Sequence, residues 1–305
     1  MHPAISVIFF TVMSGAGFGF MAMLGLGASV PDGPMSAFLI SGVAGVLAVA
    51  GLLASTFHLG HPERALKAFS QWRTSWLSRE GVLAVSTLML FAIYVLIWMA
   101  TGDRIIVLGL FVALGAAATV FATAMIYAQL KTVPQWNMQQ TPLCYLLFAA
   151  VSGVLLAASF APDGTIFGMP GAMLAMMELL MAWAAKVMWW QQAKKATLAA
   201  SGSTVETATG LGSIGKTRLL ERPHTGENYL TKEMIHKIGR KHATKLRLIA
   251  MILGCIIPVL ICLVVLLLAI SNIWLLAAFG FLMAGLFAER WLFFAEAEHS
   301  VSLYY

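Results

Sequence analysis

Long uninterrupted runs of apolar residues alternate with short polar segments along most of this 305-residue chain. A helix needs about 20 apolar residues to cross the hydrocarbon core of a bilayer. Eight runs approach or exceed that length, and each is predicted to be a helix because lipid offers no hydrogen-bond partner to exposed backbone groups. The runs cover residues 4–27, 35–58, 81–101, 104–130, 142–161, 169–193, 246–270 and 272–297.

Several of these runs are separated by turn-forming sequences, such as PDGP at 31–34 and PDG at 162–164. Small residues in GAGFG (15–19) and SGVAGVLAVAG (41–51) predict close packing between helices. The pattern therefore predicts an all-α polytopic membrane protein, a bundle of eight transmembrane helices in which residues 1–305 form a single integral membrane domain.

Ser78 and Glu80 lie just before the third apolar run, which begins at residue 81. A serine that caps a helix and an acid in its first turn both stabilise a helix N-terminus. We therefore expect these two residues to begin the third helix.

Composition supports a lipid environment. The chain is 60% hydrophobic and 10% charged, whereas a soluble domain is about 25% charged. The net charge of +6 could indicate nucleic-acid binding, but the basic residues fall between the apolar runs, as in a membrane protein. We therefore expect no nucleic-acid partner, and we expect contacts with membrane lipids.

The basic residues also predict an orientation. Sixteen of the nineteen lysines and arginines lie on one side of the eight runs, and Arg104 alone lies on the other. Basic loops stay in the cytoplasm of most membrane proteins. Both termini and the long loop between helices six and seven, residues 194–245, are therefore predicted to be cytoplasmic.

That long loop is the one substantial polar stretch of the sequence, and we expect it to dock a cytoplasmic partner, with contact to anionic lipid as the alternative. Within it, GLGSIGKT (210–217) matches the phosphate-loop pattern GxxxxGK[ST]. A functional phosphate loop needs a strand before it and a helix after it. Neither is expected here, so we interpret the match as chance.

Glu178, Lys186, Glu289 and Arg290 lie inside the apolar runs and away from their ends, where charge is costly. Glu178 is two helical turns before Lys186, and the two could form an ion pair, leave a lysine that reaches the interface, or line a proton path. Glu289 and Arg290 lie nearer the end of the last run, where Arg290 could hold a carboxylate, hold an anionic lipid headgroup, or simply extend to the membrane interface.

The three cysteines, Cys144, Cys255 and Cys262, all lie in apolar runs, and the chain has no CxxC pair. We expect buried free thiols and no disulfide framework, zinc site or iron–sulfur cluster in this chain. No covalently bound cofactor is expected.

The segment STFHLGHPER, residues 55–64, places two histidines, a glutamate and an arginine at the cytoplasmic end of the second run. Histidine titrates near neutral pH, so His58 or His61 beside Arg64 could exchange protons with a lipid-soluble quinone. Haem ligation inside the bilayer would need facing histidines on two helices. It is disfavoured because the second run is the one run of the sequence that contains a histidine. A metal site lacks a third strong ligand, and a helix cap is the simplest alternative.

Longer segments resemble the membrane-anchor subunits of the dimethyl sulfoxide reductase type, an eight-helix family. FHLGHPERA (57–65) is similar to its HLGxPxRA segment, LSRE (77–80) to its LSxE, and TVPQWNMQQTP (132–142) to its TVPxWxxxxTP loop. The stretch from Arg290 to Phe294 is similar to its last-helix arginine pattern.

The resemblance implies a complex with two partners, an iron–sulfur subunit and a molybdenum bis-pterin catalytic subunit, as a heterotrimer or a dimer of heterotrimers in the bacterial inner membrane. It also implies that His58 lines a site for ubiquinone or menaquinone. We add Arg64, Trp136, His61 and Arg290 as candidate lining residues.

The cytoplasmic orientation, the long basic loop and the ending RWLFFAEAEHSVSLYY are similar to the sulfite dehydrogenase branch of the family. The resulting hypothesis is an anchor that passes electrons from sulfite oxidation to quinone, with the sulfite chemistry in a partner subunit. The alternatives are an anchor for an S- or N-oxide reductase that oxidises quinol and, from another class, a secondary transporter with Glu178 in its pathway.

Overall fold

A computed structural model describes residues 5–57, 62–218, 220–221 and 242–303. Within these residues, eight helical segments are long and apolar enough to cross a membrane, which confirms the all-α eight-helix prediction. The eight segments are α1 (Ile5–Gly25), α2 (Pro34–Thr56), α3 (Trp76–Thr101), α4 (Ile106–Ala128), α5 (Gln140–Phe160), α6 (Gly171–Ala193), α10 to α11 (Ala243–Leu268) and η3 to α12 (Asn272–Ala295).

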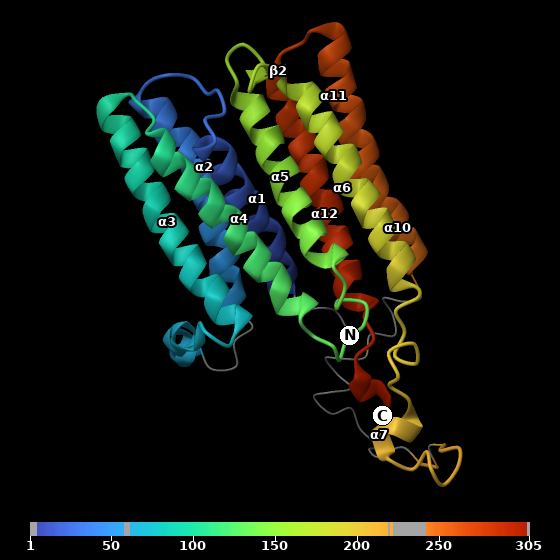
Figure 1. The fold of residues 1–305 in the computed structure, drawn as a ribbon. Helices are drawn as coiled ribbons and strands as arrows, with labels where there is room; N and C mark the ends of the chain where they lie inside the picture. Colours follow the sequence, from blue (N-terminus) through green and yellow to red (C-terminus); the bar gives the residue numbers. More distant parts are fainter. Residues whose placement is uncertain (1–4, 58–61, 219, 222–241, 304–305) are drawn as a thin grey trace.

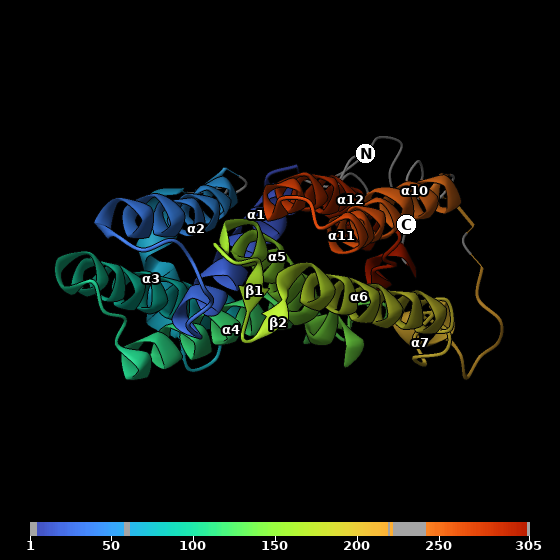
Figure 2. The same cartoon turned by 90° about the horizontal axis from the view of Figure 1, so that it is seen from above.

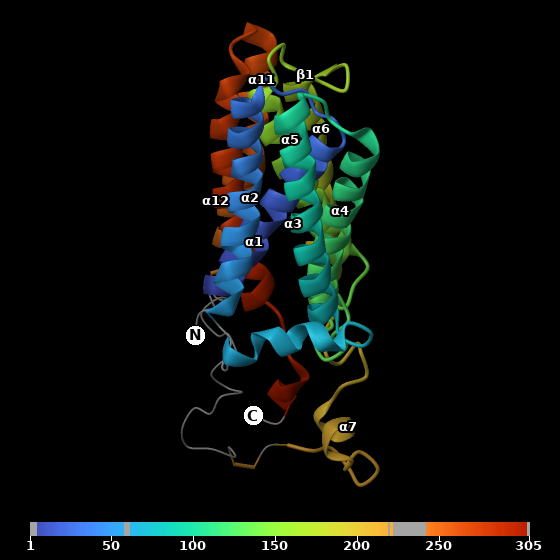
Figure 3. The same cartoon turned by 90° about the vertical axis from the view of Figure 1, so that its left-hand side faces the viewer.

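The two ends of the bundle differ in their connections (Figure 1). We call one end the basic face: it carries the 3-10 helix η1 (Pro62–Gln71), residues 129–139 and residues 194–218. Figure 3 shows η1 lying crosswise beneath α2 and α3. The opposite face carries a small hairpin of β1 (Thr165–Ile166) and β2 (Met169–Pro170).

Seen from above, α1 and α5 lie between two groups of helices (Figure 2). On one side α1 packs against α2 and α4, and α3 packs against α4; on the other side α5 packs against α6 and α12, and α12 packs against α10 and α11. The contact between α1 and α5 therefore joins the two halves of the bundle.

Glycines make this central contact possible. A Cβ atom on Gly19 would overlap the backbone carbonyl of Ala149, and one on Gly153 would overlap the carbonyl of Gly19. The α1–α2 contact is similar, with Gly17 against Ala48. The predicted role of the small-residue segments in close helix packing is confirmed.

The prediction for the start of the third helix was wrong. The helix α3 begins at Trp76, and its N-cap is Ser75, whose side chain accepts a hydrogen bond from the Ser78 backbone N–H at 3.5 Å. Ser78 and Glu80 lie inside the helix and are buried. The helix begins earlier than the apolar run because its first turn is amphipathic rather than uniformly apolar.

The seventh span is interrupted near its middle. The helix α10 (Ala243–Met251) continues into the π-helical segment η2 (Ile252–Ile256) and then α11 (Ile257–Leu268). Pro258 has no N–H to donate to the carbonyl of Gly254, four residues earlier. The indole Nε1 of Trp183 on α6 donates to that carbonyl instead, at 2.7 Å.

The phosphate-loop match does not have the strand that such a loop requires. The preceding element is α7 (Val205–Thr209), a five-residue helix that ends at Gly210. The Glu206 carboxylate accepts a hydrogen bond from the Thr217 backbone N–H at 3.3 Å. Hydrogen bonds to the Glu206 carboxylate, of which the one from its own backbone N–H has the largest effect, lower its pKa. An anionic side chain therefore lies where a phosphate would have to bind.

Candidate functional site

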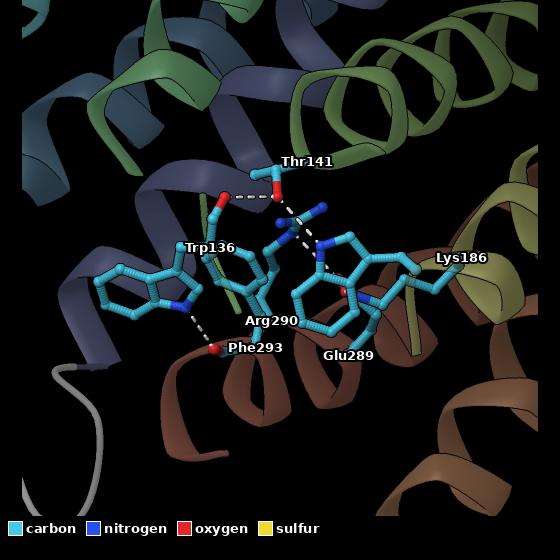
Figure 4. Close-up of polar contacts among 7 residues, drawn as sticks. Trp136, Thr141, Lys186, Glu289, Arg290 and Phe293 are labelled. Atoms are coloured by element: carbon cyan, nitrogen blue, oxygen red, sulfur yellow. Dashed lines mark hydrogen bonds and ion pairs between the residues drawn. The ribbon is translucent and has the colours of Figure 1, made fainter. Parts of the chain in front are cut away.

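Three charged side chains meet inside the bundle near the basic face (Figure 4). Lys186 on α6 forms an ion pair with Glu289 on α12, and the Arg290 Nε lies 3.0 Å from the second oxygen of the same carboxylate. Their exposed fractions are 1%, 0% and 3% in the order Lys186, Glu289 and Arg290. We call these three residues the charge cluster; two cations share one anion, so its formal charge is +1.

Aromatic rings enclose both cations. The Lys186 Nζ lies 3.6 Å from the ring centroid of Trp189, and the Arg290 guanidinium carbon lies 3.8 Å from that of Tyr145. Phe293 lies within 5.5 Å of both charges. Ring faces attract cations, and desolvated contacts of this kind contribute about 2 kcal/mol. The rings therefore offset part of the cost of a buried positive charge.

The predicted pair between Glu178 and Lys186 was wrong. Residues eight positions apart on a helix differ by about 80° in direction, so the two side chains leave α6 on different sides. Lys186 faces α12, whereas Glu178 lines an apolar groove of about 500 Å³ together with residues of α1, α4 and α5. The Glu178 Oε2 atom has no hydrogen-bond partner among the described residues.

Trp136 lies next to the charge cluster. Its indole Nε1 donates to the Phe293 carbonyl at 2.9 Å, and the two rings are stacked with centroids 5.4 Å apart. Thr141 connects this pair to α6, because its hydroxyl donates to the Trp136 carbonyl and accepts from the Trp189 indole. The structure thus brings together two of the predicted site residues, Trp136 and Arg290.

The side chains of the other three predicted site residues, His58, His61 and Arg64, lie outside the described part of the structure. His58 and His61 lie outside the described residues. The backbone of Arg64 belongs to η1, but its side chain lies outside the described part. The described helices on either side of the two histidines are α2, which ends at Thr56, and η1, which begins at Pro62.

Glu80 is a buried acid that sequence reasoning missed as a site residue. Its exposed fraction is 4%, and it accepts a hydrogen bond from the Thr123 hydroxyl of α4 at 2.5 Å. The next residue, Gly81, contacts η1: a Cβ atom there would lie 3.2 Å from the Phe69 ring. The available signal was an acid immediately before an apolar run, a pattern that also fits a helix-start residue.

A second cavity, of about 230 Å³, opens at the basic face between α6, α10 and the C-terminal segment. It is lined by Gln135, Trp189, Lys194, Arg247 and Glu296, among others. Arg247 and Glu296 form an ion pair at 2.7 Å across it. Trp189 also contacts Lys186, so the side chain of Trp189 alone lies between this cavity and Lys186 of the charge cluster.

The C-terminal segment is bound to the loop of residues 129–139. The Ser300 N–H donates to the Thr132 carbonyl at 2.9 Å, and the Glu298 N–H donates to the Gln135 side chain at 3.1 Å. The His299 Nδ1 atom accepts from the Val301 N–H at 3.0 Å, and burial lowers the pKa of this imidazole. The neutral imidazole is therefore the form that fits here.

A model of the DMSO reductase anchor subunit (DmsC) family matches residues 1–295. The chain belongs to this family. Its eight apolar helices and this membership make it a multi-pass membrane protein and an anchor subunit of an oxidoreductase. The earlier resemblance is confirmed.

One curated relative is similar to this chain over its whole length. This relative is a sulfite dehydrogenase subunit of Allochromatium vinosum. The two chains are 34% identical, in an alignment that covers 100% of this chain and 99% of the relative. No solved structure matches the chain.

The described part of this anchor protein has no group of three or more His, Cys, Asp or Glu side chains placed to hold a metal ion. Cys144, Cys255 and Cys262 are free and buried, as predicted.

Proposed function

We propose that this chain is the quinone-binding membrane anchor of a molybdenum and iron–sulfur complex that oxidises sulfite. The observation that carries the proposal is the full-length similarity to a sulfite dehydrogenase subunit, together with the family match over residues 1–295. In this proposal residues 1–305 act as one membrane domain in the bacterial inner membrane, with both termini in the cytoplasm.

The proposed division of chemistry follows from what each part can hold. Oxidation of sulfite to sulfate would release two electrons in the molybdenum subunit, and the iron–sulfur partner would deliver them to the membrane. A quinone held by this chain would take up those two electrons and two protons and be released as quinol. A group that exchanges protons near neutral pH is therefore needed beside the quinone.

His58 is the proposed contact to the quinone head group, with His61 and Arg64 beside it. Glu80 extends this set, since it is buried and its neighbour Gly81 lies against the Phe69 ring of η1, the helix that follows both histidines. Trp136 and Arg290 have their polar groups engaged with Phe293 and Glu289, so we propose that they shape the wall of the site rather than bind the head group.

The central experiment separates the two halves of the reaction. In the assembled complex, His58→Arg is expected to abolish sulfite-dependent reduction of a short-chain quinone while sulfite oxidation with a soluble dye continues. His242→Arg, at an exposed histidine that precedes α10, is the matched control and should retain most quinone reduction. Normal quinone reduction in the His58→Arg complex would overturn the proposed site.

A second candidate is an anchor for an S- or N-oxide reductase, which would run the electron transfer from quinol to the partner. The description of the matching family favours it. Purified complex assayed with sulfite and with dimethyl sulfoxide separates the two. The secondary-transporter hypothesis has no support from these similarities, and solute uptake by the lone chain in liposomes would be needed to revive it.

The orientation has its own test. A reporter fused after Tyr305 is expected to be active in the cytoplasm. An external C-terminus would exclude cytoplasmic sulfite oxidation by subunits docked at the basic face.

A further inference from the structure

The groove that Glu178 lines opens sideways out of the bundle. Its volume is about 500 Å³, within the range of about 300–1,000 Å³ that is typical of small-molecule sites. Gly19 and Ala149 in its lining are buried, whereas Leu110 and Leu114 at its rim are 46% and 66% exposed. Figure 2 shows α4 and α6 on the same side of the bundle, with α1 and α5 farther in. Because these helices span the membrane, the exposed rim faces lipid and the groove opens to the hydrocarbon.

The groove is shorter than a transmembrane helix. Its lining runs from Phe18 to Leu26 on α1 and from Leu110 to Val120 on α4. Ten residues of helix rise about 15 Å, which is half of the hydrocarbon thickness of about 30 Å. A transmembrane helix of another protein would need a contact face along the whole span, so the groove fits a smaller lipid-soluble molecule.

The lining is flat because most of it is made of small side chains. The glycine and alanines of the groove are Gly19, Ala22, Ala113, Ala116, Ala117, Ala149 and Ala150. A surface of this kind lets a planar ring approach the helix backbones closely, as small residues do between packed membrane helices.

Glu178 is the one polar side chain among the described residues that line the groove. Its Oε2 atom is buried and has no hydrogen-bond partner among those residues. An ionised carboxylate without a counter-charge is far more costly in hydrocarbon than a neutral carboxylic acid. The neutral acid carries an O–H that needs an acceptor. The occupant of the groove should therefore supply a hydrogen-bond acceptor at the depth of Glu178.

That depth distinguishes between lipid-soluble occupants. Glu178 lies about 10 Å along the axis of α6 from the first residue of the helix, Gly171. The ester and headgroup oxygens of a phospholipid lie outside the hydrocarbon core, and its acyl chains carry no acceptor, so a phospholipid would leave the Glu178 O–H unpaired. A quinone has carbonyl oxygens on a flat apolar ring and dissolves in hydrocarbon, so it satisfies both the groove and the acid.

We propose that the groove binds the ring of an oxidised quinone from the membrane pool, with a quinone carbonyl accepting a hydrogen bond from the neutral Glu178 carboxyl. The inference rests on the proposed function for the presence of the quinone, and it adds a second site, separate from the head-group contact at His58. Glu178 lies about 12 Å farther from the basic face than Lys186 of the charge cluster, measured along α6. The groove holds the quinone on the lipid side of the bundle, and no electron or proton is transferred there.

Photolabelling of the assembled complex in lipid nanodiscs tests the site. The probe is a short-chain quinone with an azido group on its ring, and peptide mass spectrometry maps the labelled residues. We expect label within residues 18–26 of α1 or 110–120 of α4, and we expect excess unlabelled short-chain quinone to remove it. Label that is absent from these segments, or that unlabelled quinone does not remove, overturns the site.

Variants of Glu178 test the hydrogen bond. In Glu178→Leu the groove label should fall about tenfold, the effect of losing one buried hydrogen bond. Glu178→Gln keeps a donor and should retain most of the label. Met177→Leu is the matched control, because that side chain is half exposed and lies outside the groove lining. Equal labelling of Glu178→Leu and the wild-type complex would overturn the role of the acid.

A steric variant keeps the test independent of the acid. Ala117→Phe places a ring in the groove and leaves Glu178 intact, so it should also remove the label. Label that appears only when the azido group is moved to the quinone tail would overturn the proposal, because the groove would then hold the tail of a quinone bound elsewhere. A phospholipid that copurifies with the wild-type complex and is lost in Ala117→Phe would overturn it in favour of a lipid site.

The two quinone sites fail separately. The groove label should persist in His58→Arg, and its loss there would overturn a second site. Failure of the proposed head-group contact appears instead as normal quinone reduction in His58→Arg, whatever the label in the groove. The labelling itself requires no sulfite oxidation.

Discussion

The indole nitrogen of Trp183 lies 2.7 Å from the carbonyl oxygen of Gly254, which is the carbonyl that Pro258 leaves without a helical partner. A side chain of α6 thus supplies the hydrogen bond that the seventh span cannot supply from its own backbone at this carbonyl. The same Gly254 packs against Gly285 of α12 with no room for a side chain between them. The three helices are held together at this point by a hydrogen bond and by close backbone contact.

The first prediction concerns this hydrogen bond. Trp183→Phe keeps an aromatic ring in the site but leaves the Gly254 carbonyl unsatisfied in an apolar environment, which costs about 1–3 kcal/mol. We expect a lower unfolding temperature in detergent, measured by loss of helical circular dichroism. Trp274→Phe is the control, since that ring is 57% exposed and lies near the opposite face. Equal effects of both changes would show that the bond contributes little.

The second prediction ranks substitutions in the charge cluster. Glu289→Gln leaves two buried cations with no anion, and removing one partner of a buried pair costs about 3–5 kcal/mol. Lys186→Met should cost less, because Glu289 keeps its contact with Arg290. Unfolding of the purified chain in a denaturing detergent series measures the order.

Glu178→Gln is the control for that series. Its carboxylate has one oxygen without a partner among the described residues, so the change should be neutral or stabilising. A larger loss from Lys186→Met than from Glu289→Gln would contradict the description of the cluster.

The third prediction tests the contact that joins the two halves of the bundle. A Cβ atom at Gly19 would overlap the Ala149 carbonyl, so Gly19→Ala should destabilise the fold by about 1–3 kcal/mol. Gly45→Ala is the matched change, because its Cβ meets nothing within 4 Å in the described structure, and alanine favours a helix. The same detergent unfolding assay should show opposite signs for the two variants.

The fourth prediction concerns acid. Burial lowers the pKa of His299 below its ordinary value of 6.5, so the folded form prefers the neutral imidazole. The resulting stabilisation of the C-terminal segment is present above about pH 6.5 and is lost as the pH falls through the lower folded value. The protection factors of the Ser300 and Val301 amides, which compare exchange with the intrinsic rate at each pH, should therefore fall in mild acid.

His299→Asn provides the control for this pH effect. The asparagine side chain can accept the Val301 hydrogen bond and does not titrate, so its exchange profile should lose the acid-dependent step. Protection factors that fall equally in both proteins would assign the effect to another group.

The apolar runs were sufficient to predict the eight spans because lipid forces such segments into helices. The partners of the individual charged residues were harder to predict from the sequence. Lys186 has Glu178 nearby on its own helix, yet it pairs with Glu289 of α12, a residue more than a hundred positions away. Only the packing of α6 against its neighbours decides which side of that helix faces a partner.

Local rules failed where tertiary contacts dominate. Glu80 had the position of a helix-start acid, but Ser75 caps the helix instead, and Glu80 is buried with its carboxylate bound to Thr123 of α4. Pro258 marks an interruption in the seventh span that sequence alone could have signalled, whereas the indole donor that serves it comes from a different helix. His58 and His61 remain predictions.

The charge cluster also has a consequence for how the protein is made. The two spans that contribute its charges, Gly171–Ala193 and Asn272–Ala295, have the lowest mean hydropathies of the eight, 1.4 and 1.6. During synthesis α6 emerges first and must enter the membrane with Lys186 unpaired until α12 follows. Lys186 lies within two turns of the helix end, so its ammonium group can reach the interface during that interval. Translation of the last helix then supplies the Glu289 carboxylate, so the pairing of Lys186 is complete only after α12 has been made.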